Sequence, residues 1–304
     1  MLQAFPPATA VISRLLSFLL AALAALLALV APANAQTDAT FAVEVVGSGA
    51  DVVLIPGLSS SGPVWDGTVA RLSSRHRLHV VTLAGFGHVA PVEAGHRDGF
   101  LDAVLDDLEA YVRALDTPVA VVGHSLGGWT ALRLGLEAPG AVSRVVVVDA
   151  VPFLAAMQNP AATEESVAPM GAQMKRIMAL ASPEQFRVQQ EMALTGMITD
   201  PDTAAAYLDI HAASDPGTVA QAMHDMYTTD LRALVPALEV PTLVMAAGAG
   251  YGGMDVGALY DTQYGDAPAV RVEVVPGTRH FIMLDQPGTF ADRLASFLAP
   301  PAAP

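Results

Sequence analysis

The sequence contains no cysteine and only one lysine, Lys175. The absence of cysteine excludes disulfides, thiolate zinc sites and a cysteine nucleophile. Lysine and arginine together number 15, against 30 aspartate and glutamate residues, and the formal net charge is −15. A chain this acidic is unsuited to binding a nucleic-acid backbone, which needs clustered basic side chains. We therefore expect a small-molecule partner and no nucleic acid.

Apolar residues make up 53% of the 304 residues, and part of this content lies in an uncharged run from Leu15 to Val30. The run is shorter than the about 20 residues that a membrane span needs. Arg14 precedes it and Ala33-Asn34-Ala35 follows it, an order typical of a secretory signal peptide. Residues 1–35 are therefore expected to be cleaved off before Gln36, leaving an exported, periplasmic or secreted protein without a stable membrane anchor. An uncleaved N-terminal anchor is the alternative.

After this segment, short runs of β-branched residues alternate with helical stretches. This alternation indicates an α/β protein with a mainly parallel sheet. Residues 144–148 carry consecutive valines, which predicts a strand that is buried on both faces. Strands are expected over residues 41–46, 51–55, 78–83, 119–122, 144–148, 242–246 and 270–275, and helices over residues 64–75, 100–115, 126–137 and 288–298.

The alternation stops between residues 152 and 236, where helical stretches follow one another without a strand pattern. We therefore expect a helical cap inserted into a core made of residues 36–151 and 237–304. Most of the chain's 12 methionines lie in this insertion, and methionine forms adaptable apolar surfaces. The cap is expected to roof an apolar pocket. Pairs typical of a turn and a helix start interrupt it at Asn159-Pro160, Ser182-Pro183, Asp200-Pro201 and Asp215-Pro216.

The most specific motif follows the predicted strand 119–122. The sequence there reads Gly123-His124-Ser125-Leu126-Gly127-Gly128, a G-x-S-x-G pattern between a strand and a helix. Such a turn strains the serine backbone and lifts the hydroxyl off the sheet, and the small residues on either side avoid collisions. The N-terminus of the helix behind it presents N–H groups to a developing negative charge. Ser125 is therefore the candidate nucleophile.

With this motif in place, the chain resembles the α/β-hydrolase fold superfamily, and in particular its capped, esterase- and lipase-like serine hydrolases. The resemblance extends over residues 41–299 and also includes Pro56-Gly57-Leu58, residues 84–88 and residues 277–281. It implies a mainly parallel central sheet flanked by helices, with an inserted helical cap. Members commonly have His-Gly where this chain has Pro56-Gly57, and the backbone donor of the next residue remains usable.

The resemblance also implies a histidine base and an oxyanion hole. Of the eight histidines, His280 stands between the last predicted strand and the final helix, where the family's catalytic histidine lies. His124 is next to the serine but on the wrong side of the turn to accept its proton. The backbone N–H groups of Leu58 and Leu126 are the expected oxyanion donors. The serines at 59–61 are interpreted as a polar loop that caps the next helix.

The acid that orients the histidine has two candidates. The family's usual position is the loop after the strand 242–246, and there Asp255 arrives several residues later than the usual spacing. Some branches, such as those resembling haloalkane dehalogenases, place the acid at the end of the preceding strand, where this chain has Asp149. A carboxylate at the carboxyl edge of a central strand lies where α/β sites form. Asp149 is therefore preferred, with Asp255 as the alternative.

Together these residues predict a serine hydrolase that acts through an acyl-enzyme on a small to medium apolar ester or a related carbonyl compound. Trp129, Phe153 and Phe281 are candidate walls of the substrate pocket. The sequence shows no metal-ligand spacing and no nucleotide-binding loop, so neither a metal nor a cofactor is expected. The alternatives on the same fold are an aminopeptidase, a lactonase, a C–C bond hydrolase, a cofactor-free peroxidase and a non-catalytic ligand-binding protein.

Overall fold

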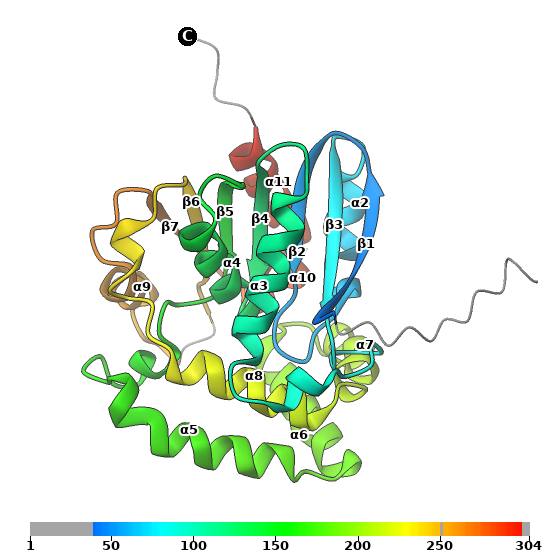
Figure 1. The fold of residues 1–304 in the computed structure, drawn as a ribbon, viewed down its shortest axis with the longest axis vertical. Helices are drawn as coiled ribbons and strands as arrows, with labels where there is room; N and C mark the ends of the chain where they lie inside the picture. The colour runs from blue at the N-terminus through cyan, green and yellow to red at the C-terminus, as the bar shows by residue number, and fades with distance from the viewer. Residues whose placement is uncertain (1–38, 250–251, 300–304) are drawn as a thin grey trace, which may run out of the picture. The chain divides into compact units, whose positions relative to one another are not determined.

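The computed structural model describes residues 39–249 and 252–299, so the predicted signal peptide lies outside the described residues. The described chain forms a seven-stranded sheet with helices on both faces (Figure 1). Within these two ranges, no helix has the length and apolar character that crossing a membrane requires.

The strand order is β1-β3-β2-β4-β5-β6-β7. β1 pairs with β3 in antiparallel orientation, and every other neighbouring pair is parallel. The predicted α/β architecture with a mainly parallel sheet is therefore confirmed. The strands are β1 (Phe41–Gly47), β2 (Ala50–Ile55), β3 (His76–Leu83), β4 (Val119–His124), β5 (Val142–Val148), β6 (Thr242–Ala247) and β7 (Val270–Val275).

Side chains of the central strands alternate between two apolar layers. In β2, Val53 and Ile55 belong to the same core as residues of α3 and α4, whereas Val52 and Leu54 belong to a second core with residues of α2 and α11. A sheet covered on both faces exposes its strand ends, and these ends carry the functional residues. The covering helices are α2 (Asp66–Leu72), α3 (Phe100–Arg113), α4 (Leu126–Glu137) and α11 (Pro287–Leu298).

Four helices follow β5 before the chain returns to the sheet at β6, and they gather at the carboxyl ends of the strands (Figure 1). Three of the four proline pairs begin helices, because Ser182, Asp200 and Asp215 each accept a hydrogen bond from a backbone N–H of the first turn,. Asn159-Pro160 begins no helix, and Thr163 caps the next one instead. These helices are α5 (Glu164–Ala179), α6 (Pro183–Met197), α7 (Pro201–Ala212) and α8 (Pro216–Thr228).

The cap helices are tied to the sheet domain by polar contacts. Lys175 on α5 forms an ion pair of 2.7 Å with Asp98, which precedes α3. Asp215 accepts from His96 at 2.6 Å, and its backbone N–H donates to the Gly85 carbonyl at 2.7 Å. The first contact ties α5 to the segment before α3, and the two contacts of Asp215 hold the start of α8 against the loops that follow β3.

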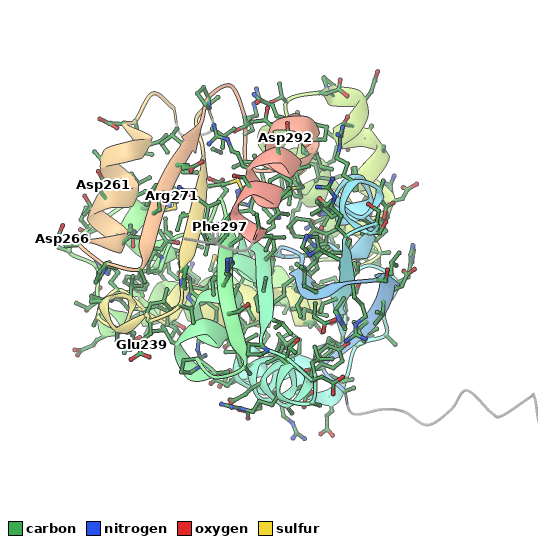
Figure 2. All side chains as sticks on the ribbon, turned by 90° about the horizontal axis from the view of Figure 1, so that it is seen from above. Glu239, Asp261, Asp266, Arg271, Asp292 and Phe297 are labelled. Atoms are coloured by element: carbon green, nitrogen blue, oxygen red, sulfur yellow. The ribbon has the colours of Figure 1, made fainter. Side chains whose placement is uncertain are left out.

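The structure contains two helices that the sequence patterns did not predict, α9 (Val256–Tyr264) and α10 (Ile282–Asp285). The predicted helix 64–75 is a 3₁₀ turn at Gly62–Trp65 followed by the shorter α2. Figure 2, seen from the end opposite the cap, shows α9, which carries Asp261, beside the edge strand β7, which carries Arg271. α9 matters for function because it brings Tyr260 to the carboxyl ends of β5 and β6.

Candidate active site

Ser125 occupies a strained turn between β4 and α4. Its backbone has φ 53° and ψ −118°, in the left-handed half of conformational space that non-glycine residues rarely adopt,. The Ser125 N–H donates to the Val148 carbonyl at 2.9 Å, which fixes the turn to the end of β5. Strain held in place by surrounding structure is common at functional sites.

The two glycines of the motif are required by close backbone contacts. A Cβ on Gly123 would stand 1.9 Å from the Gly127 carbonyl oxygen, and a Cβ on Gly127 would stand 2.2 Å from the Ile55 carbonyl oxygen. No side chain fits at either distance. The predicted need for small residues on both sides of Ser125 is therefore confirmed.

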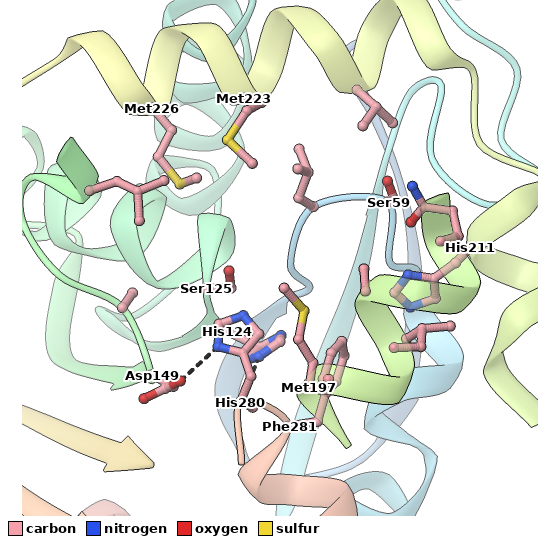
Figure 3. Close-up of a pocket in the computed structure, with 18 of the residues that line it drawn as sticks. Ser59, His124, Ser125, Asp149, Met197, His211, Met223, Met226, His280 and Phe281 are labelled. Carbon is pink, nitrogen blue, oxygen red and sulfur yellow. Dashed lines mark hydrogen bonds and ion pairs between the residues drawn. The ribbon is translucent and has the colours of Figure 1, made fainter. Parts of the chain in front are cut away.

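Asp149 and His280 meet next to this turn. The His280 Nδ1 lies 2.7 Å from the Asp149 Oδ2. A carboxylate accepts and does not donate, so the proton of the imidazole sits on Nδ1 and the Nε2 lone pair remains available as a base. Figure 3 shows the His280 ring with Asp149 on one side and Ser125 on the other, and all three residues line one cavity.

Among the described residues, three donors hold the buried Asp149 carboxylate. Besides His280, the Ala247 N–H donates to Oδ1 at 2.7 Å and the Tyr260 hydroxyl donates to Oδ1 at 2.8 Å. The side chain is 0% exposed, and its own backbone has φ 49°. A carboxylate that accepts this many hydrogen bonds is held in one position.

Asp255, the alternative acid, lies elsewhere. It is the N-cap residue of α9, and its carboxylate accepts from the Ala258 N–H at 3.1 Å. The structure therefore brings Asp149 and not Asp255 to His280. Asp255 has the ordinary role of a helix cap.

His124 lines the same cavity and supports the loop that carries His280. It is 1% exposed, and its Nε2 donates to the His280 backbone carbonyl at 3.0 Å. Burial, followed by the charge of His280, holds the pKa of His124 well below its ordinary value. His124 is thus a neutral residue that supports the loop carrying His280.

The loop after β2 passes close to the serine turn. A Cβ on Gly57 would stand 2.8 Å from the His124 Nδ1 and 3.2 Å from the Ser125 Cβ, so only glycine lets the loop approach this far. Leu58, the next residue, lines the cavity. Leu126 is the first residue of α4, where a backbone N–H has no acceptor within the helix,. Both expected oxyanion donors therefore lie on backbone segments that border Ser125.

The cavity around these residues has a volume of about 530 Å³. Its roof comes from the cap, which contributes Met178, Met197, Met223 and Met226, while Met170 is 58% exposed on the outside. The volume lies within the range of small-molecule sites. The remaining walls are formed by residues that follow the strands and by α6 and α7, including Val151, Leu154, Gln190, Leu194 and His211.

The prediction that Trp129 and Phe153 line the substrate pocket is wrong. Trp129 is 1% exposed in the core beneath α4, with the Arg133 guanidinium 5.3 Å from its ring centre. Phe153 is fully buried in a small separate cluster, with Arg232 at 4.9 Å. Neither contributes to the wall of the cavity, because packing of each ring against its neighbours fills the space around it. Phe281 does line the cavity.

The interpretation of residues 59–61 as helix caps is also wrong. Ser61 precedes the 3₁₀ turn but makes no side-chain cap hydrogen bond. The hydroxyls of Ser59 and Ser60 are buried and have no hydrogen-bond partner among the described residues. Ser59 has φ 57° and borders the cavity.

Sequence reasoning missed Tyr260 and assigned no role to His211 or Gln190. Tyr260 lies on a helix without a clear apolar period, so no pattern pointed to it. His211 and Gln190 were hidden within the cap helices, where nothing in the sequence separates a pocket residue from a packed one. In the described ranges, no group of three or more His, Asp or Glu side chains is arranged to hold a metal ion.

Known proteins show the same architecture. The model of the alpha/beta hydrolase family matches residues 52–293. A pimeloyl-(acyl-carrier protein) methyl ester esterase of Nitrosomonas europaea is 28% identical over 268 residues, covering 83% of this chain and 97% of that protein. The enzyme of the same name from Aliivibrio salmonicida is 30% identical over 210 residues, covering 69% of this chain and 76% of that protein.

A solved structure agrees at the level of the fold. The thermophilic esterase from Thermogutta terrifontis is 21% identical, with a TM-score of 0.68 over 85% of this chain and 92% of that chain. The family match spans most of the chain, so this protein belongs to the alpha/beta hydrolase family. The resemblance found in the sequence is therefore confirmed.

Proposed function

We propose that this protein is a serine esterase in which Ser125, His280 and Asp149 act together. Ser125 Oγ attacks the ester carbonyl while His280 Nε2 accepts its proton, and Asp149 stabilises the charged imidazole that forms. The same histidine then protonates the leaving alcohol. Water, activated in turn by His280, releases the acid from the acyl-enzyme.

The observation that carries this proposal is the 2.7 Å contact between His280 and the buried Asp149, made inside the cavity that Ser125 also lines. This arrangement supports the proposal because it matches a nucleophile with a nearby histidine base that a carboxylate orients. The backbone N–H groups of Leu58 and Leu126 would receive the oxyanion, and each such donor is worth about 3 kcal/mol in the transition state.

The cavity and the relatives support esters as the substrate class. The methionines of the cap roof an apolar space of about 530 Å³, which suits a small to medium acyl or alcohol group,. The curated relatives at 28% and 30% identity are named as methyl ester esterases. Esters are therefore favoured over the other reactions that this fold supports.

A fluorophosphonate probe tests the nucleophile directly. It should label the wild-type protein, and Ser125→Ala should abolish both labelling and the hydrolysis of 4-nitrophenyl esters. Absence of labelling in the wild type would instead favour a ligand-binding protein. A preference for short charged esters within a 4-nitrophenyl series would contradict an apolar substrate.

We also propose that residues 1–35 act as an export signal, because an apolar run follows Arg14 and ends in Ala33-Asn34-Ala35,. N-terminal sequencing of protein recovered from the periplasm or the medium should begin at Gln36. A full-length chain that sediments with membranes would support the uncleaved anchor.

A further inference from the structure

The cavity has two chemically different sides. Met223 and Met226 from α8 form an apolar side above Ser125 (Figure 3). Ser59 and His211 lie together on another side, beyond Met197 and Phe281 in the same view. Gln190 of α6 lines the cavity as well and is 9% exposed. The second side is therefore polar.

Two polar atoms on this side have no hydrogen-bond partner among the described residues. They are the Ser59 hydroxyl and the His211 Nε2, both buried, in side chains that belong to residues only 2% and 3% exposed. Buried polar groups in folded proteins are almost always hydrogen-bonded, and an exception requires an explanation. Both residues line the cavity, so a ligand group toward which these two side chains turn is one such explanation.

The backbone holds Ser59 and His211 in these positions. The Ser59 carbonyl accepts from the Ser214 hydroxyl at 3.1 Å, and the same hydroxyl accepts from the Gly87 N–H at 2.9 Å. Ser214 follows α7, and its N–H donates to the His211 carbonyl at 3.2 Å. One hydrogen-bonded chain therefore joins the loop after β2 to the end of the helix that carries His211. Ser59 keeps a left-handed backbone there, a strain that clusters at ligand-binding positions,.

The polar side carries no formal charge near neutral pH. Burial lowers the pKa of His211 to about 4, so its imidazole is neutral. Ser59 and Gln190 have no charge of their own. A carboxylate or an ammonium group brought here would lose its water without gaining an opposite charge, which is costly. A neutral hydrogen-bonding group meets donors and acceptors at little cost.

The polar side is also close to the reacting residues. The Phe281 ring contacts both histidines, with its centre 5.9 Å from His211 and 5.6 Å from His280. One aromatic ring thus stands between the proposed base and the polar side. A substrate bound at Ser125 would have to extend over Phe281 to reach Ser59 and His211.

We propose that Ser59 and His211, with Gln190 on the wall of the same cavity, form a subsite for an uncharged hydrogen-bonding group of the substrate. The preferred substrate is then a bifunctional ester that carries a neutral ketone, amide or hydroxyl a few bonds from the scissile carbonyl. This inference rests on the proposed esterase function and specifies its substrate class. The apolar chain between the two groups lies along Phe281 and the cap.

Three 4-nitrophenyl esters of similar length test the subsite: the hexanoate, the 5-oxohexanoate and the hydrogen glutarate. The wild-type kcat/KM should be about tenfold higher for the oxo ester than for the hexanoate, as one added hydrogen bond allows. The charged glutarate should be the poorest of the three. A 4-oxo analogue covers a shorter spacing between the two groups.

The variants His211→Phe and Ser59→Gly should each bring the ratio of oxo ester to hexanoate close to one. His88→Phe is the matched control, because His88 is exposed outside the cavity, and it should keep the wild-type ratio. Ser59→Gly suits a left-handed backbone and decides the question if His211→Phe does not fold.

The outcomes separate the two proposals. Ester hydrolysis without a preference for the oxo ester, a preference for the glutarate, or a ratio unchanged in both variants would overturn the subsite and leave the esterase intact. Absence of both hydrolysis and fluorophosphonate labelling would refute the esterase function, and the subsite with it.

Discussion

Asp149 and His280 are 131 positions apart in the chain, and a hydrogen bond of 2.7 Å joins them. Asp149 comes directly after β5, and His280 follows β7, so the cap and β6 lie between them in sequence. The parallel sheet explains the meeting, because carboxyl ends of neighbouring parallel strands share one edge. The orientation of the proposed base therefore depends on a strand end two strands away from its own.

Exchanging the two candidate acids for amides should separate their roles. Asp149→Asn should lower kcat by about 10⁴-fold, because an amide no longer stabilises the imidazolium or fixes its tautomer. Asp255→Asn should keep kcat, since asparagine caps a helix as well as aspartate does. Steady-state hydrolysis of a 4-nitrophenyl ester measures both. A normal rate in the first variant and a collapse in the second would reverse the assignment.

The Tyr260 hydroxyl should affect catalysis through Asp149. Tyr260→Phe removes a donor to the buried carboxylate, and we expect kcat to fall by about tenfold, with a loss of about 1–3 kcal/mol in the free energy of unfolding. Tyr264→Phe is the matched control, because its hydroxyl donates to the Ala150 carbonyl at 2.8 Å. The control should lose stability and retain kcat. Equal kcat in the two variants would show that Tyr260 is merely structural.

Gly57 should tolerate no side chain. Gly57→Ala places a methyl group 2.8 Å from the His124 Nδ1 and 3.2 Å from the Ser125 Cβ, so the loop carrying Leu58 must move away. A displacement of about 1 Å at a reacting centre costs about 10²-fold in rate. Gly67→Ala, in α2, has open space around the added methyl and should retain activity. Comparable activities in the two variants would show that the close approach is not needed.

His211 should make the protein less stable in mild acid. Burial lowers its pKa to about 4 in the folded protein, against about 6.5 in an unfolded chain,. Between these values only the unfolded chain takes up the proton. The free energy of unfolding therefore falls as the pH drops through this window, by at most about 3 kcal/mol.

His211→Phe should flatten this dependence of stability on pH. Urea unfolding from about pH 7 to about pH 4 gives the slope, and His88→Phe, at an exposed position, should reproduce the wild-type slope,. His124 remains in both variants and contributes in the same direction, so some dependence persists. A slope unaltered by His211→Phe would show that this imidazole is not held neutral.

The local motifs could be predicted, and contacts between distant segments could not. The serine turn was predictable because backbone atoms lie too close to Gly123 and Gly127 for a side chain to fit. Those atoms belong to residues a few positions away or to the neighbouring strand. The helix starts at Ser182, Asp200 and Asp215 were predictable because a cap is a contact over three residues. In these cases the physical cause and its effect lie close together in the sequence.

The walls of the cavity depend on packing between elements far apart in the chain. Trp129 and Phe153 are large aromatic residues of the kind that often line pockets. In this structure each ring packs inside a core cluster instead. Tyr260 reaches Asp149 only because α9 packs beside β6 and β7, and its own sequence carries no sign of that contact. A large apolar side chain in a sequence predicts that the residue will be buried. It does not predict which other residues will surround it.

The ion pair between Lys175 and Asp98 allows the contact between the cap and the sheet domain to be followed by covalent modification. Lys175 is the only lysine of the chain, and its amine is paired with Asp98 of the sheet domain at 2.7 Å. An acylating reagent that reacts with amines therefore modifies one side chain besides the α-amine, and that side chain lies at the junction of the cap and the sheet domain. The rate of modification at Lys175 reports how often its ion pair with Asp98 opens, in the native sequence and without an added label.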